Sequence, residues 1–350
     1  MGRDARVLAR IVIAAFVILP LSSPAAEDPA DDKDKWTMSA LFENDMFGGK
    51  DENYTNGVKL SFISPDVDEY RESGNIPPWI LPVLDNLPFV HEPGIRRTVG
   101  FSLGQKIFTP RDTESTELVE DDRPYAGWLY ASTALNNKNT RQLDSLEVQL
   151  GVVGPAALGE DAQNTVHDLR DIPEARGWDN QLSNELGVAF IYEHKERLPL
   201  PGPGRWGGDF IPHYGGAIGN VFTYANIGAE VRWGWNPPVD FGTSLIRPGG
   251  DANAPVDSSD PRLSQDGRPG AYGFAAVSGR WVLRDIFLDG NTFSDSHSVD
   301  KKPLVGDLIL GVGMTWRGFK ISYAQVFRTE EFDGQPDNHN FGSLSVSWTY

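Results

Sequence analysis

Three polar clusters in the sequence carry the residue types that hydrolytic chemistry uses. They are Glu43-Asn44-Asp45, Tyr54-Thr55-Asn56-Gly57 and Gln163-Asn164-Thr165-Val166-His167. Histidine titrates near neutral pH and is the commonest general base, so His167 is the candidate to activate a water molecule. Asp45, Asn44 and Thr55 offer hard oxygen ligands of the kind that Ca²⁺ accepts, although a neighbouring histidine can also draw Zn²⁺.

Each cluster also has a plainer interpretation. Asn44-Asp45 after a strand is more often a turn than a pair of ligands, and Thr55-Asn56-Gly57 is a common turn sequence. A histidine in a loop is more often a surface residue than a base. The argument for a site therefore depends on whether the fold brings the three clusters to one place.

The third cluster has the features of a short helix from Gly159 to Arg170. Asp161 can cap its start, residues 162–169 contain no helix breaker, and Pro173 prevents continuation. Gln163 and His167 are four residues apart and would share one face of this helix.

A second hydrolytic candidate is the pair Ser296-His297, because serine and histidine together suggest acyl transfer. Adjacent residues in a loop seldom align as nucleophile and base, so this pair is a minor alternative. The sequence contains no His-Glu-x-x-His zinc helix.

The elements that must position these residues are strands. Apolar and polar residues alternate in many segments, most clearly in Leu344, Val346, Trp348 and Tyr350 against the intervening serines and Thr349. An alternating final strand with terminal aromatics is typical of a transmembrane barrel. We predict about twelve strands, an even number as bacterial barrels require, at 36–43, 54–63, 97–108, 124–135, 144–153, 184–195, 210–222, 225–236, 271–283, 304–316, 318–328 and 341–350.

This strand list predicts an all-β, antiparallel up-and-down barrel with a short extracellular helix. The extracellular links would be 45–53, 109–123, 154–183, 223–224, 284–303 and 329–340, which brings all three clusters to one end. The periplasmic links would be 64–96, 136–143, 196–209, 237–270 and Arg317-Gly318. The segment 237–270 is rich in Pro, Gly, Asp and Ser, and we predict a mobile loop there. Lys59, Lys106 and Glu147 would point into the lumen.

Export is predicted by the N-terminus, where three arginines precede a short apolar stretch and small residues. We expect residues 1–26 to be a cleaved signal peptide and residues 27–350 to form a barrel in the outer membrane. The absence of cysteine excludes thiolate chemistry and disulfides, and the net charge of −18 argues against a nucleic-acid partner. We expect a membrane-embedded monomer.

Several motifs together resemble the outer-membrane lipid A deacylase family (lipid A 3-O-deacylase). They are Phe42-Glu43-Asn44-Asp45-Met46-Phe47, Tyr54-Thr55-Asn56-Gly57, Gly104-Gln105-Lys106-Ile107-Phe108-Thr109-Pro110, Gly154-Pro155 through Gln163-Asn164 and His167, and Gly177-Trp178-Asp179-Asn180-Gln181 with Asn184-Glu185. The resemblance implies a twelve-stranded barrel that removes the 3-O-linked acyloxyacyl group of lipid A, or lipopolysaccharide, with Ca²⁺. Its active-site residues would fall on Asn44, Asp45, Thr55, Gln163 and His167.

One departure from the family pattern concerns a catalytic lysine expected in the loop after the third strand. Residues 109–117 contain no lysine. Arg111, Arg123 and Lys106 are the candidate substitutes. Two other functions stay open at this point, namely an outer-membrane phospholipase that uses Ser296 and His297, and a porin or structural barrel without catalysis.

Overall fold

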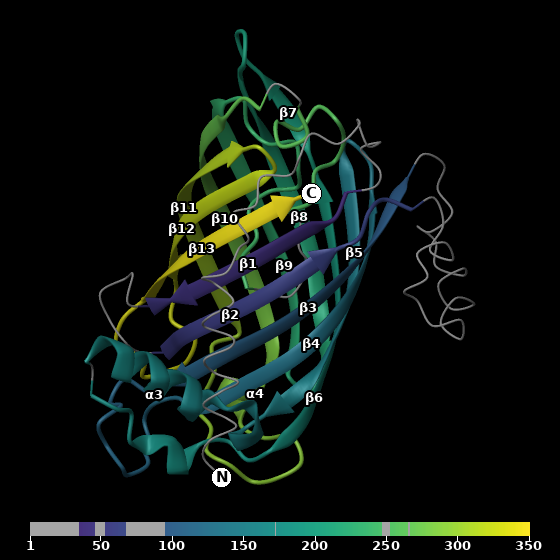
Figure 1. Cartoon of the computed structure of the whole chain (residues 1–350). Coiled ribbons are helices and arrows are strands. Elements are labelled where there is room, and N and C mark those ends of the chain that lie inside the picture. The colour runs from purple at the N-terminus through teal and green to yellow at the C-terminus, as the bar shows by residue number, and fades with distance from the viewer. Residues whose placement is uncertain (1–34, 46–52, 68–94, 172, 247–252, 265–266) are drawn as a thin grey trace.

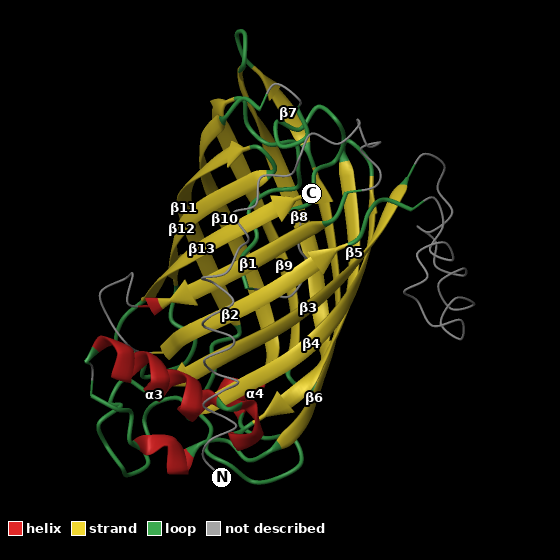
Figure 2. Ribbon diagram, in the orientation of Figure 1, coloured by secondary structure: helices red, strands yellow, loops and turns green. Residues whose placement is uncertain are grey.

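The computed structural model describes residues 35–45, 53–67, 95–171, 173–246, 253–264 and 267–350. The expected signal peptide, residues 1–26, lies outside the described residues. Within them, the strands form one sheet that closes into a barrel (Figures 1 and 2). No helix in the described part of the chain is long and apolar enough to cross a bilayer.

Twelve of the described strands form the closed ring, and one more extends it. Neighbours in sequence pair antiparallel, β1 closes the ring against β13, and β6 pairs with β8. The predicted antiparallel up-and-down barrel is confirmed, and each predicted strand overlaps an observed one. The strands are β1 (Thr37–Asn44), β2 (Asn53–Ile63), β3 (Arg96–Thr109), β4 (Ala126–Lys138), β5 (Gln142–Val153), β6 (Glu185–Glu196), β7 (Leu198–Pro201), β8 (Trp206–Gly219), β9 (Phe222–Trp235), β10 (Gly270–Asp285), β11 (Leu304–Trp316), β12 (Phe319–Arg328) and β13 (His339–Thr349).

Two details of the strand prediction are wrong. β7 was not predicted, because Pro199 and Pro201 interrupt the pattern and lack the N–H that a central strand needs. The turn predicted at 223–224 lies at 220–221. Asn220 is the first residue after β8. Its side chain accepts a hydrogen bond from the Val188 backbone N–H of β6, at 2.8 Å.

Alternation along the strands separates a polar lumen from an apolar outer wall. Lys59, Lys106 and Glu147 are buried, as predicted for side chains that point inward. Leu103 and Leu150, by contrast, are about half exposed on the outer wall. An outward apolar band is what the hydrocarbon of a membrane requires, since the strand hydrogen bonds satisfy the backbone within the barrel.

The two ends of the barrel differ. The helices α3 (Gly159–Arg170) and α4 (Ile286–Asp289) lie at one end, called the α3 end below (Figure 1). The end of β1 and the start of β2 lie at the same end, whereas β7 and the C-terminus lie toward the opposite, β7 end. All three polar clusters of the sequence therefore gather at the α3 end, as predicted.

A plug enters the lumen from the β7 end. It consists of residues 237–246 and 253–264, for which we predicted a mobile loop. That prediction is wrong for these residues. The plug side chains Phe241 and Val256 are buried and pack with Leu143 of β5, so the segment contributes to the interior of the barrel.

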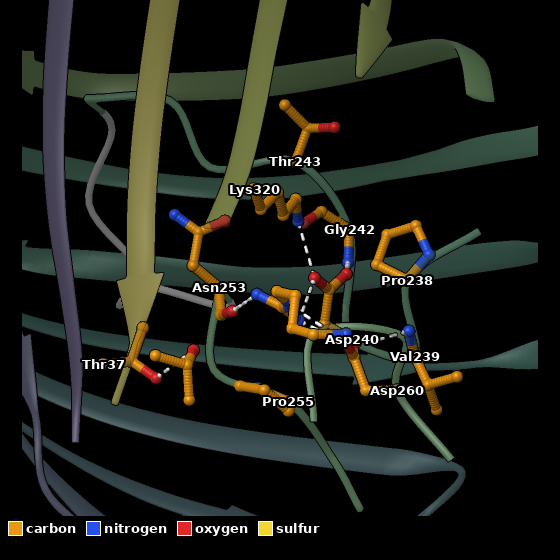
Figure 3. Close-up of polar contacts among 12 residues, drawn as sticks. Thr37, Pro238, Val239, Asp240, Gly242, Thr243, Asn253, Pro255, Asp260 and Lys320 are labelled. Carbon is orange, nitrogen blue, oxygen red and sulfur yellow. Dashed lines mark hydrogen bonds and ion pairs between the residues drawn. The ribbon is translucent and has the colours of Figure 1, made fainter. Parts of the chain in front are cut away.

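Ion pairs hold the plug to the wall, and Figure 3 shows their centre. The fully buried Asp240 carboxylate lies 2.7 Å from the Lys320 ammonium of β12 and 2.9 Å from the Arg262 guanidinium of the plug. It also pairs with Arg232 of β9. Burial alone would raise the pKa of Asp240, but the three cations hold it below its usual range. The composition of the plug is typical of a loop. The plug nevertheless packs inside the barrel, because strand residues supply cations that pair with its carboxylate.

Candidate active site

Helix α3 has the predicted bounds, Gly159–Arg170. Its start differs from the prediction, because the N-cap is Leu158 in the left-handed conformation and not Asp161. The turn Pro155–Ala157 leads directly into the helix, so Asp161 falls within the first helical turn. Its negative charge is favourable there, near the positive end of the helix dipole.

The outer wall of the barrel carries α3 and the segment that follows it. Ile107 of β3 packs with Tyr125, Ala175 and Trp178, and Ala162 of α3 joins this cluster. The chain also passes close to Gly127 of β4. A Cβ atom there would lie 3.0 Å from the Ala157 Cβ and 3.3 Å from the Gly159 Cα, so the close approach of the helix start needs glycine.

Three side chains of α3 bond to the segment 173–178, which returns along the helix. The Trp178 indole N–H donates to the Gln163 Oε1 atom at 2.9 Å. The Ala175 backbone N–H donates to the Asn164 Oδ1 atom at 3.1 Å, and the His167 Nδ1 atom lies 2.6 Å from the Pro173 carbonyl oxygen. The returning segment therefore fixes the side chains that the sequence singled out on this helix.

The contact of His167 determines which ring nitrogen can act as a base. A carbonyl oxygen only accepts hydrogen bonds, so in the neutral ring the proton belongs on Nδ1. The Nε2 atom is then the basic nitrogen. An imidazole whose Nδ1–H is held by an acceptor is oriented as a general base must be.

The second predicted helix residue, Gln163, presents an unsatisfied donor. Its Oε1 atom accepts from Trp178, whereas its Nε2 atom is buried and has no hydrogen-bond partner among the described residues. A buried donor without a partner costs about 1–3 kcal/mol. A water molecule, a substrate carbonyl or a developing oxyanion would satisfy it.

Asn44 and Asn56, from the first two clusters, face the same side of the sheet as Ile107, on which α3 packs. In register, Asn44 pairs with Asn56, and Asn56 pairs with Ile107 beneath the α3 cluster. Glu43 and Lys106 line the lumen, so their neighbours Asn44 and Ile107 face outward. Two strand spacings separate Asn44 from Ile107, about 10 Å along the sheet.

Burial distinguishes these wall residues from the lipid-facing band. Asn44 is 5% exposed and Asp45 is fully buried, although Asn44 belongs to the outer face. Thr55 is the extra residue at an irregularity of the β2–β3 register between Tyr54 and Asn56. Its side chain lies outside the described residues. The structure thus buries Asn44, Asp45, Gln163 and His167 at the α3 end of the barrel, which α3 and its neighbouring segments cover.

The donor chemistry of this region fits Ca²⁺ better than Zn²⁺. No group of three or more His, Cys, Asp or Glu side chains in the described ranges could hold a metal ion. Zn²⁺ sites generally need three or four such ligands, many of them nitrogen or sulfur. Ca²⁺ accepts amide, backbone and water oxygens beside a carboxylate, which is what Asn44 and Asp45 offer.

Two of the three candidate substitutes for the missing lysine are committed to the lumen side. The Lys106 ammonium lies over the rings of Tyr54 and Phe222, at 5.8 and 5.7 Å from their centroids. Arg123 is buried and pairs with Glu331 at 2.8 Å. Lys106 and Arg123 thus lie on the other side of the wall from α3, whereas Arg111, two residues beyond β3, is exposed.

The alternative pair Ser296-His297 stabilises loops. The Ser296 hydroxyl accepts a hydrogen bond from the Asn291 backbone N–H at 2.8 Å. The His297 Nε2 atom lies 2.7 Å from the Asp122 carbonyl oxygen. Both side chains are thus occupied by backbone groups, which does not favour a nucleophile and its base.

The lumen is filled where the structure describes it. The cavity beside Glu43 and Tyr54 measures about 70 Å³, and the one beside Phe241 of the plug about 10 Å³. These volumes hold a few water molecules at most. The described residues therefore do not favour the porin hypothesis.

The fold and this covered region define a membrane β-barrel whose candidate site lies on its outer wall, outside the lumen. The model of the family described as outer membrane protein LpxR matches residues 11–350. The chain belongs to this family, whose members are outer-membrane proteins.

A solved structure supports this fold. LpxR from Salmonella typhimurium superposes with a TM-score of 0.68 and 19% sequence identity, over 89% of this chain and 99% of that chain. The β domain of the Bordetella autotransporter BrkA is more distant, with a TM-score of 0.42 and 6% identity, over 90% of this chain and 98% of that one. No curated protein matched the chain.

Proposed function

We propose that this protein is a lipid A 3-O-deacylase, an ester hydrolase that removes the 3-O-linked acyl or acyloxyacyl group of lipid A in the outer leaflet. The observation that carries the proposal is the contact of the His167 Nδ1 atom with the Pro173 carbonyl, on a helix that covers the outer wall. In the neutral ring this contact makes Nε2 the basic nitrogen, and the buried Gln163 amide donor lies one turn away on the same helix.

The reaction would begin with a proton transfer from water to His167 Nε2. The resulting hydroxide attacks the ester carbonyl carbon, and the carbonyl oxygen becomes an oxyanion that the Gln163 Nε2 donor can stabilise. Collapse of the tetrahedral intermediate breaks the bond to the sugar oxygen, which takes the proton back from His167. The products are a fatty acid and a free hydroxyl group.

Asn44, Asp45 and Thr55 are the residues that would hold a calcium ion. When bound, Ca²⁺ supplies positive charge that stabilises the oxyanion. The separation of roles is consistent with the fold, since the wall strands β1 and β2 carry the oxygen ligands and α3 carries the base and the amide donor.

Location supports a lipid substrate. Asn44 and Ile107 face outward from the wall, so a ligand approaches the site from the side of the barrel. We propose that residues 1–26 are removed on export, that the α3 end faces the cell exterior, and that the protein acts as a monomer. A site at this end would meet the lipid A of the outer leaflet.

The test is mass spectrometry of lipid A from cells that express this chain or its His167→Ala variant, with Ca²⁺ supplied. We expect loss of one 3-O-linked unit only with the intact histidine, and retention of lipid A when the calcium is chelated. Unchanged lipid A in both strains, while a known deacylase cleaves it in the same host, would reject the proposal.

A further inference from the structure

We propose that Glu43 is a positioning residue, which ties the Asn44-Asp45 pair at the end of β1 to the plug inside the lumen. This inference rests on the proposed function, because it assigns those two residues a calcium ion. It adds a role for the plug tip, Ile246, which lies on the other side of the wall from the candidate site.

The contact itself is a buried, charge-assisted hydrogen bond. The Ile246 backbone N–H donates to the Glu43 Oε1 atom at 2.7 Å, and Glu43 is 2% exposed. Hydrogen bonds to a carboxylate are shorter and about twice as strong as neutral ones. Because successive side chains of a strand alternate, the same stretch of β1 is held from inside at Glu43 and faces outward at Asn44.

The opposite strand leaves room for this contact. Glu43 pairs in register with Gly57 of β2. A Cβ atom on Gly57 would collide with the Tyr54 hydroxyl and lie 3.1 Å from the Ile246 Cδ1 atom. Because Gly57 has no side chain, both Tyr54 and Ile246 fit beside the Glu43 carboxylate.

The plug is anchored close to Ile246, so the residue that contacts Glu43 is itself held in place. Lys320 of β12 donates to the Gly242 carbonyl oxygen at 3.0 Å. The Thr243 backbone N–H donates to the Glu230 carboxylate of β9 at 3.1 Å. Only two residues separate Thr243 from Ile246, which limits how far the tip can move.

The consequence is that β1 is braced at the residue before the proposed calcium ligands. Residues that orient metal ligands usually change metal affinity about 10- to 100-fold when they are replaced. We expect calcium affinity to fall by this factor when the hydrogen bond between Glu43 and Ile246 is removed. Glu43→Ala removes its acceptor, and Ile246→Pro removes its donor N–H.

The experiment measures Tb³⁺ binding to the folded full-length protein, with Tb³⁺ as a luminescent substitute for Ca²⁺. The relevant signal is the part that Asp45→Asn removes, and folding of each variant is checked by its heat-modifiable electrophoretic mobility. Deacylation rates are measured in parallel. Glu43→Gln is the conservative variant, since its amide oxygen can still accept from Ile246.

Glu185→Ala is the matched control. The Glu185 carboxylate is also buried and accepts a backbone N–H at 2.7 Å, from Thr292, but it lies on β6 and bonds to residues outside the plug. A general loss of stability from deleting a buried carboxylate would appear in this variant too. A loss of Tb³⁺ affinity should not.

We expect Glu43→Ala and Ile246→Pro each to weaken Tb³⁺ binding about 10- to 100-fold, with little further loss in the double variant because both break one bond. Glu43→Gln should recover most of the affinity. If the wild type binds Tb³⁺ and cleaves lipid A but the folded variants bind with its affinity, the positioning role is wrong and the proposed function stands. A wild type that does neither overturns both.

Discussion

At the scale of single residues, the candidate site depends on a few side chains whose partners fix which atom faces the substrate. Gln163 shows this clearly, because the Trp178 indole holds its oxygen, and its buried amide nitrogen is therefore the atom left to donate. The orientation of an amide follows from its hydrogen bonds, so the neighbouring indole determines what Gln163 offers.

Trp178→Phe should therefore lower activity without disrupting the fold. The phenyl ring keeps the contact with Tyr125, whose ring centroid lies 5.0 Å away, but it donates no hydrogen bond to Gln163. We expect the deacylation rate to fall about three- to tenfold, as a neutral hydrogen bond contributes about 0.5–1.5 kcal/mol. Trp128→Phe is the control, since the buried Trp128 indole N–H has no partner among the described residues. Equal rates for both variants would contradict the role of Trp178.

Glu331 in the link after β12 gives a prediction for pH. Burial alone would raise its pKa, but Arg123 and Arg328 outweigh that effect and lower it from 4.5 to about 2. A carboxylate whose pKa is depressed by folding stabilises the protein above its unfolded pKa, and this contribution is lost as the pH falls toward the folded value. We expect Glu331→Gln to remove up to about 3 kcal/mol of pH-dependent stability between pH 4.5 and 2.

Unfolding by urea at a series of pH values measures this effect. Glu330→Gln is the neighbouring control, because Glu330 pairs with Lys302 in solvent at 2.7 Å and such pairs contribute little. If the free energy of unfolding of Glu331→Gln falls as steeply with decreasing pH as that of the wild type, the prediction is wrong.

At the scale of elements, the plug shows how charges far apart in sequence make one packed unit. Asp240 lies in a segment without regular secondary structure, and its cations come from β9, β12 and the plug itself. Removing the carboxylate would leave these three cations buried together.

Asp240→Asn should thus destabilise the barrel by about 3–5 kcal/mol, the usual effect of removing one partner of a buried ion pair. The free energy of unfolding, from urea titration in vesicles, checks this value. Asp257→Asn, in the same plug, should change it by less than about 0.5 kcal/mol, since the Asp257 side chain bonds only to Ser259 among the described residues. The wild type should show no steady conductance in a planar bilayer, and ion leak through Asp240→Asn would show that the plug seals the lumen.

The strands and α3 could be predicted from the sequence because their signals are local. The alternation around Lys59 and Glu147 gave the correct inward faces, and the breaker at Pro173 agrees with the observed end of α3. The plug could not be predicted, since its burial depends on Arg232 and Lys320 of distant strands. The proline-rich β7 was not predicted for a related reason, because only its pairing with β8 identifies it as a strand.

The candidate site was predictable in part. Its four described residues were named from motifs, and the fold brings them to one end. The partner of His167 was not foreseen, because a backbone carbonyl carries no sequence signal. The lumen contacts of Lys106 and Arg123 with Phe222 and Glu331 also depend on residues far along the chain.

At the scale of the whole molecule, the two ends of the barrel must face different compartments. The chain has no cysteine, so single cysteines can report on each end. We expect Asp295→Cys, at the α3 end, to react with a membrane-impermeant maleimide in intact cells. Thr140→Cys, in the link between β4 and β5, should react only after the outer membrane is permeabilised. The reverse pattern would place the candidate site in the periplasm.

The ion-paired plug also affects how much of this protein an envelope can carry. An open barrel adds a leak for every copy inserted, so its abundance is limited by the solutes that the cell must keep out. A barrel whose interior is neutralised and packed around Asp240 adds surface without adding a passage. We therefore expect that a cell can raise the copy number of such a protein without making its outer membrane more permeable.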